Sequence, residues 1–193
     1  MADFNLRHAR GPFWLELIVA ASAILISVAS LWVAVRAGQT QERLLAANVW
    51  PYLQFQTSDF PTPVSEIAFW LQNAGVGPAR LRWATLYYKD RPYASAQAAF
   101  LACCAAKLTK RNGITQYLQS RVMTPSQMVK FISVTKAGTD PAAWNRLDVE
   151  RLNFHLRACY CSVLDDCWIF DDRRSQPQPV NDCPPAVQPA FNG

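Results

Sequence analysis

The residues LIVAASAILISVASLWVAV occupy positions 17–35 and contain no charged side chain. A helix of this length rises about 28 Å, which is close to the ~30 Å hydrocarbon thickness of a bilayer. Phe13, Trp14 and Trp32 suit the two interfaces, where aromatic side chains are enriched. The stretch predicts a transmembrane helix over residues 13–36, preceded by a cytoplasmic tail at 1–12 and followed by a helical stalk at 37–48.

The same stretch has a second interpretation, a cleavable signal peptide. Val35-Arg36-Ala37 resembles a small-residue cleavage site. However, the apolar run exceeds the roughly 7–15 residues of a signal-peptide core. We therefore expect an uncleaved signal anchor in a single-pass protein.

The orientation depends on flanking charges and on the cysteines. Arg7 and Arg10 precede the segment, whereas Arg36 and Arg43 follow it, so the positive-inside bias is slight. All six cysteines lie in the C-terminal part, which fits an oxidising compartment. We expect a bacterial inner-membrane protein whose N-terminus is cytoplasmic and whose C-terminal domain is periplasmic.

Small residues recur at spacings of three and four along one face of the predicted membrane helix. Small side chains allow helix backbones to approach closely in a bilayer. The stripe therefore predicts a partner helix, either in a homo-oligomer or in another protein, although Ala and Ser are also common elsewhere in the span. The stripe consists of Ala20, Ala23, Ser27, Ser30 and Ala34.

The composition limits what the remainder can be. The chain has 193 residues, 51% of them hydrophobic and 17% charged. That length allows one domain with a real core and excludes a wholly disordered chain or a multidomain enzyme. Six cysteines are too few for a fold held mainly by disulfides.

Short apolar alternations predict an antiparallel β domain after residue 48. About seven strands with few helices favour a mainly β fold, namely a two-sheet β-sandwich of immunoglobulin-like outline, with a partly open barrel as the alternative. The domain should cover residues 49–174, and the proline-rich stretch 175–193 should form an extended or mobile tail. The expected strands cover 50–56, 65–72, 80–88, 114–119, 128–135, 154–163 and 168–171, and the expected helices 95–110 and 140–147.

Three short blocks resemble a recurrent pattern in uncharacterised bacterial proteins with one N-terminal membrane helix and a small extracytoplasmic β-domain. They are the sequences ANVWPYL at 47–53, LQNAGVGPA at 71–79, and CYCSV at 159–163 with Cys167-Trp168. The resemblance implies the anchor and the β-domain. It brings no activity and no catalytic residues.

The glycine-rich segment Asn73 to Pro78 invites comparison with phosphate-binding loops. A dinucleotide fingerprint would need a third glycine where Arg80 stands, and a P-loop would need Gly-Lys-Ser/Thr. We expect instead a tight turn between two strands. In it, glycine should supply positive φ, and Asn73 should bond local backbone groups.

The cysteines carry the most informative chemistry. Cys159 and Cys161 share one face of a predicted strand, and Cys167 lies across the following turn, which favours a Cys161–Cys167 disulfide. Cys183 could bridge to Cys159, Cys103 or Cys104 and hold the tail on the domain. Because Cys103 and Cys104 are adjacent, we expect them to have different partners or to leave one thiol free. The disulfide candidates are Cys103, Cys104, Cys159, Cys161, Cys167 and Cys183.

The alternative for these cysteines is a metal or thiol-redox site. His155, Cys159, Cys161 and Cys167 offer four N and S ligands that would suit Zn²⁺ or copper. Their spacing fits no standard zinc motif, and no C-x-x-C is present. We therefore expect structural disulfides and no cofactor.

Residues for catalysis are scarce. His8 falls in the predicted cytoplasmic tail, and no G-x-S-x-G motif is present. The acidic pairs Asp165-Asp166 and Asp171-Asp172 flank a predicted hairpin, and we interpret them as solvated turn residues. The sequence therefore favours a protein that is not an enzyme.

Charge is distributed unevenly in the domain. Residues 80–136 carry ten basic residues and one acid, a net charge of +9, whereas residues 137–193 carry five bases and eight acids, a net charge of −3. The two parts could neutralise each other, or the basic part could bind anionic lipid, an acidic envelope polymer or an acidic protein. The candidate basic surface comprises Arg80, Arg82, Lys89, Arg91, Lys107, Lys110 and Arg111.

These expectations combine into one functional hypothesis. The chain should be a membrane-anchored periplasmic binding or accessory module that presents a disulfide-stabilised domain to a protein or envelope partner. Nucleic acid is excluded as a partner by the expected compartment. The alternative is a periplasmic metal-binding or thiol-redox protein that uses Cys159, Cys161 and Cys167, with an enzyme acting on envelope glycans or lipids as a third possibility.

Overall fold

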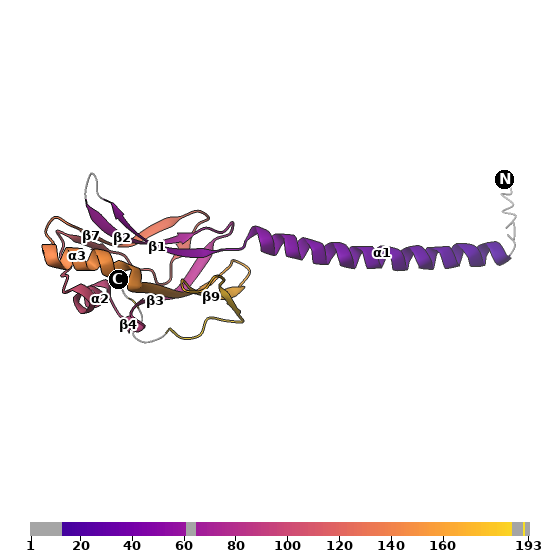
Figure 1. The fold of residues 1–193 in the computed structure, drawn as a ribbon. Coiled ribbons are helices and arrows are strands. Elements are labelled where there is room, and N and C mark those ends of the chain that lie inside the picture. Colours follow the sequence, from indigo (N-terminus) through magenta and orange to yellow (C-terminus); the bar gives the residue numbers. More distant parts are fainter. Residues whose placement is uncertain (1–12, 61–64, 187–190, 192–193) are drawn as a thin grey trace, which may run out of the picture. The chain divides into compact units, whose positions relative to one another are not determined.

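The computed structural model describes residues 13–60, 65–186 and 191. The chain divides into two compact units, Met1–Leu45 and Ala46–Gly193 (Figure 1). The first unit contains most of α1, which runs from Phe13 to Asn48 without a break and has no buried residue. By length and composition α1 can cross a membrane, and it is the one such helix in the described part of the chain. The expected membrane helix and stalk are therefore one continuous helix.

The second unit contains two antiparallel sheets (Figure 1). The first sheet has the strand order β1-β2-β7-β5, and the second has the order β10-β9-β8-β3-β4, with β6 also paired to β3. The strands are β1 Leu53–Phe60, β2 Glu66–Asn73, β3 Ala79–Tyr88, β4 Arg91–Tyr93, β5 Gly113–Thr115, β6 Val122–Met123, β7 Met128–Thr135, β8 Phe154–Cys161, β9 Cys167–Asp171 and β10 Gln178–Val180.

The fold class is only partly the expected one. Two antiparallel sheets are present, but helices and strands each cover about a third of the chain. The α1 helix alone accounts for 36 residues, so "mainly β" describes the second unit better than the chain.

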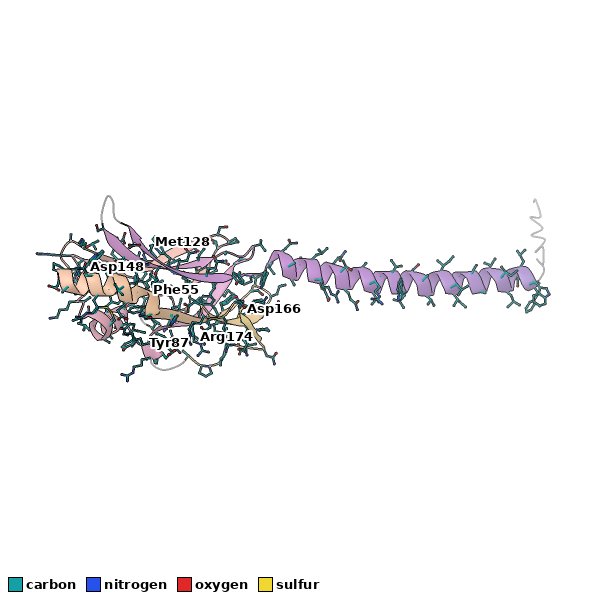
Figure 2. All side chains as sticks on the ribbon, in the orientation of Figure 1. Phe55, Tyr87, Met128, Asp148, Asp166 and Arg174 are labelled. Carbon is teal, nitrogen blue, oxygen red and sulfur yellow. A yellow bond between two sulfur atoms is a disulfide. The ribbon has the colours of Figure 1, made fainter. Side chains whose placement is uncertain are left out.

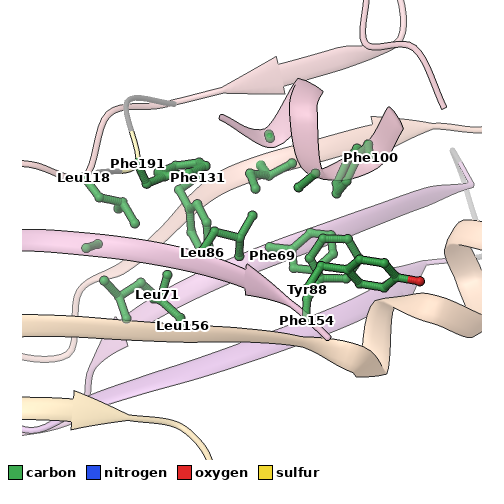
Figure 3. Packing of buried hydrophobic residues seen from close by; sticks show 14 of the residues in the cluster. Phe69, Leu71, Leu86, Tyr88, Phe100, Leu118, Phe131, Phe154, Leu156 and Phe191 are labelled. Atoms are coloured by element: carbon green, nitrogen blue, oxygen red, sulfur yellow. The ribbon is translucent and has the colours of Figure 1, made fainter. Parts of the chain in front are cut away.

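One hydrophobic core joins the two sheets. Phe69 of β2 and Phe154 of β8 come from different sheets, and their ring centroids are 5.3 Å apart. Phe100 of α2 (Ala96–Cys104) contacts both rings, at 5.6 and 5.5 Å. Figure 3 shows these side chains together with Leu86 and Phe131 in the same cluster. Fully burying an aromatic side chain contributes about 1.5–3 kcal/mol, so these rings together stabilise the domain by several kcal/mol.

The first domain helix, α2, is shorter than the expected helix at 95–110. Ser95 caps its N-terminus by accepting a hydrogen bond from the Ala98 N–H. The helix ends because Ala105 adopts φ 54°, and the Ala106 N–H then bonds the Phe100 carbonyl. This bonding pattern turns the chain and buries Ala106 in the core, where a continuing helix could not place it.

The second domain helix is α3 (Pro141–Glu150), which packs against α2. Asp140 caps it by accepting a hydrogen bond from the Ala143 N–H, and Pro141 occupies the first turn, as the Asp-Pro sequence predicts. A short 3₁₀ turn, η1 (Arg151–Asn153), then leads into β8.

The proline-rich C-terminal segment, which we expected to lie outside the domain, is part of it. β10 pairs with β9, and Cys183 is bonded to Cys159 of β8. Further on, Phe191 is fully buried beside Phe131, at a centroid distance of 6.0 Å. The segment is therefore a strap across the second sheet, fixed by pairing, a disulfide and a buried ring.

Candidate functional site

The candidate site is the cysteine-rich end of the second sheet, built on the β8–β9 hairpin. Residues 154, 156, 158 and 160 of β8 face the core, so Cys159 and Cys161 face the other side of the sheet. Cys161 lies directly opposite Cys167 of β9, and a disulfide joins them, as the spacing across the turn predicts. The turn between them is closed by a bond from the Ser162 N–H to the Asp166 carbonyl, with Asp165 at φ 65°.

A second disulfide joins Cys159 to Cys183, at a Cα–Cα distance of 5.8 Å. This pairing is one of those left open by the sequence. The Trp83 indole, on the strand next to Cys159, donates a hydrogen bond of 2.7 Å to the Pro184 carbonyl. The disulfide and this hydrogen bond therefore hold the strap on the outer face of β3 and β8.

The third disulfide joins Cys103 to Cys104 in the last turn of α2. The expectation that these neighbours take different partners, or leave one thiol free, is wrong. The other four cysteines pair with one another on the outer face of the second sheet, whereas Cys103 and Cys104 belong to the core cluster. Each of the two therefore has only the other within reach.

The sulfur atoms of Cys161, Cys167 and Cys183 lie within 4.8 Å of one another. They form the one group of potential metal ligands among the described residues, and it differs from the group expected from sequence. Cys183 takes part, whereas His155 does not. All three sulfurs are in disulfides, so a thiolate that could bind metal would form only after reduction.

His155 instead faces a carboxylate. Its Nδ1 lies 3.2 Å from Asp172 Oδ2, and Asp172 Oδ1 accepts a hydrogen bond of 2.8 Å from the Leu156 N–H. Burial raises the pKa of the Asp172 carboxyl, and these two hydrogen bonds only partly oppose the effect. The expectation of solvated turn acids is therefore wrong for Asp172. It is also wrong for Asp171, which is 7% exposed and interacts with Arg157 and Arg173.

The other acidic pair is exposed, as expected. Asp165 forms an ion pair with Arg80. Its neighbour Asp166 can be found by its label in Figure 2. Beside this pair the surface is hollowed by a cavity of about 510 Å³. Its lining consists of Asp165, Asp166, Cys167, Trp168, Pro179, Val180 and Asn181.

The glycine-rich segment forms the turn between β2 and β3. The buried Asn73 side chain accepts hydrogen bonds from the Tyr52 and Gly75 N–H groups and donates one to the Gly77 carbonyl, which confirms its predicted role. The expected positive φ is wrong, because Gly138 is the one described glycine with such a φ. A Cβ on Gly77 would instead lie 1.9 Å from the Val49 carbonyl oxygen, so glycine is required by a close backbone approach.

The candidate basic surface is partly neutralised. Arg80 pairs with Asp165, and Lys89 pairs with Glu150 at 3.1 Å, so these two cations meet acids from the C-terminal part. The remaining five basic residues are exposed and form no ion pair with the described residues. They are Arg82, Arg91, Lys107, Lys110 and Arg111.

The helix stripe also lies on an exposed surface. Ser30 and Ala34 line a shallow groove on α1. The Ser27 hydroxyl donates to the Ala23 carbonyl, so this polar group is already satisfied within the helix.

No protein-family model, curated protein or solved structure matches this chain. The resemblance to bacterial anchored β-domain proteins therefore stays a prediction. The functional interpretation depends on the geometry described above.

Two features of the site could not be predicted from sequence. The contacts of Asp171 and Asp172 depend on strand register, because their partners Arg157 and Leu156 lie in the neighbouring strand. The second feature is the docking of the strap beyond its disulfide, because the pairing of β10 and the burial of Phe191 could not be inferred from so proline-rich a segment. The Cys159–Cys183 disulfide itself was one of the expected alternatives.

Proposed function

We propose that this chain is a single-pass bacterial inner-membrane protein whose C-terminal domain lies in the periplasm and acts as a binding or accessory module without catalytic activity. The observation that carries the proposal is the state of the cysteines: all six are in disulfides within a unit that follows an apolar helix. Stable disulfides are typical of oxidising compartments.

We propose further that the two sheets pack as a β-sandwich of immunoglobulin-like outline. The contact between Phe69 and Phe154 supports this arrangement, since it joins the inner faces of the two sheets. The strap covers β3 on the outer face of the second sheet, where Trp83 is 7% exposed and Thr85 is fully buried.

The binding surface that we favour is the cationic segment after α2. Lys107, Lys110 and Arg111 lie within five residues of one another and have no acidic partner among the described residues. Exposed charges that are unpaired attract polyanions, and salt weakens that attraction. The ligand would be an acidic polymer or an acidic protein surface of the envelope.

Topology can be tested with two reporters fused after Gly193. Alkaline phosphatase should be active and green fluorescent protein dark, because the first needs export and the second fails to mature when it is exported unfolded. A variant that lacks residues 13–35 is the control and should reverse both signals. A fluorescent fusion of the intact chain would contradict the proposal.

Binding can be tested by elution of the detergent-solubilised chain from a polyglutamate column. Substituting Lys107, Lys110 and Arg111 by Gln should lower the salt concentration needed for elution. Lys89→Gln is the matched control, since Lys89 is already paired with Glu150. If both variants elute at the same salt concentration, the segment with Lys107, Lys110 and Arg111 is not the polyanion-binding surface.

A further inference from the structure

Two disulfides of this domain touch each other. The Sγ atoms of Cys161 and Cys183 belong to different disulfides but lie only 3.8 Å apart. The contact exists because Cys159 and Cys161 are two residues apart on one face of β8, so the partner of each approaches the other. A sulfur released from one disulfide would therefore already be next to a sulfur of the second.

We propose that these two disulfides form a thiol–disulfide exchange site, in which a substrate thiol enters at Cys167 and the exchange passes through Cys161 and Cys183 to Cys159. The exchange is stoichiometric and not catalytic, so it goes beyond the proposed module without contradicting it, and it requires no binding partner. It differs from a metal site because it uses the cysteines in their bonded state.

The entry point follows from the cavity. Cys159 and Cys161 are both 0% exposed. Cys167 is 5% exposed and lines the cavity of about 510 Å³ beside the hairpin, whereas Cys183 is half-buried and is not part of that lining. A thiol in that cavity would meet the Cys167 sulfur first. The carboxylate of Asp166, which is exposed and forms no ion pair with the described residues, favours a thiol on a cationic or neutral carrier over an anionic one.

Each step is an ordinary thiol–disulfide exchange, in which one S–S bond forms as another breaks. The substrate thiol loses its proton to solvent, and its thiolate attacks Cys167 Sγ to form a mixed disulfide while the Cys161–Cys167 bond breaks. Cys161 leaves as a thiolate and attacks Cys183 Sγ, which forms Cys161–Cys183 and breaks Cys159–Cys183. Cys159 leaves as a thiolate and takes up a proton. One thiol is consumed and one is released, so no other oxidant or reductant is needed.

The residue opposite Cys161 suits this chemistry. Arg80 is the direct register partner of Cys161 on β3, so the two side chains extend from the same face of the sheet. Its Nη2 atom pairs with Asp165, but its Nε atom is buried and has no hydrogen-bond partner among the described residues. A nearby guanidinium stabilises a thiolate, which here would be the departing Cys161.

The first test treats the wild-type full chain, in detergent, with cysteamine, a small cationic thiol. The reaction is stopped with acid and excess N-ethylmaleimide. Cleavage by chymotrypsin after Tyr160 then separates Cys159 from Cys161, so mass spectrometry can assign each bond. We expect cysteamine on Cys167, a new Cys161–Cys183 bond and alkylated Cys159. Mercaptoethanesulfonate, which is anionic, should react several-fold more slowly.

The second test uses Cys167→Ser, which leaves Cys161 free without any added thiol. Alkylation should divide between Cys161 and Cys159, because Cys183 would exchange between them. Cys103→Ser is the matched control: it leaves one thiol at Cys104, far along the chain, and the label should stay there. If the Cys167→Ser variant does not fold, the experiment with cysteamine on the wild-type chain still tests the proposal.

Several results would overturn the proposal. They are cysteamine bound first at Cys103 or Cys104, three unchanged disulfides after treatment, equal rates with the cationic and anionic thiols, or label confined to Cys161 in a folded Cys167→Ser variant.

Discussion

The three disulfides should contribute very unequally to stability, and the order can be worked out from the loops they close. A cross-link lowers the entropy of the unfolded chain by about 2.1 + 1.5R ln n cal/mol/K for a loop of n residues. Cys159–Cys183 spans a sequence separation of 24, Cys161–Cys167 spans 6, and Cys103–Cys104 spans 1. At 25 °C the relation gives about 3.4, about 2.2 and about 0.6 kcal/mol, respectively.

Each disulfide would be removed in turn by replacing both of its cysteines with alanine, which gives three double variants. The free energy of unfolding would be measured by pulse proteolysis of the detergent-solubilised full chain in urea. Loss of Cys159–Cys183 should also lower the melting temperature by roughly 7–14 °C, at about 2–4 °C per kcal/mol for a domain of this size. Equal effects of all three double variants, or the largest effect from Cys103–Cys104, would refute the loop-closure argument and the strap.

Three further predictions concern other parts of the molecule. Gly77→Ala should destabilise the domain by more than about 1 kcal/mol in the same urea assay, since its Cβ would clash with backbone; a neutral effect would contradict the close approach. Burial raises the pKa of Asp172 above its ordinary 3.8, so the folded state holds that proton more tightly, and stability should fall as pH rises through the folded pKa. The Asp172→Asn variant should lack this decline in stability. Identical pH profiles of the variant and the wild type would contradict the assignment of the decline to Asp172. Ser27→Leu should weaken self-association or partner recovery in mild detergent, whereas Ser22→Leu, off the stripe, should not; equal assembly of both would remove the stripe from the account.

Local patterns in the sequence predicted the elements that depend on local chemistry. The Asp-Pro sequence at 140–141 starts α3, and β7 occupies residues 128–135 as its alternation predicts. The Cys161–Cys167 disulfide was also predictable, because a short turn brings these residues opposite each other whatever the remaining topology is.

Features that depend on contacts between distant segments were not predictable. The early end of α2 reflects the need to bury Ala106 in a core shared with both sheets. Cys103 and Cys104 pair only because the other four cysteines pair among themselves on the outer face of the second sheet. The strap depends on Phe191, whose burial beside Phe131 cannot be inferred from the prolines around it.

The most direct test of the central claim is a thiol count on protein in intact membranes. The sample would be alkylated before and after reduction and analysed by mass spectrometry. The account predicts no labelled cysteine before reduction and six after it, because all six cysteines are in disulfides in a domain that we propose to be extracytoplasmic. Six labelled cysteines before reduction would contradict the disulfides and the compartment together.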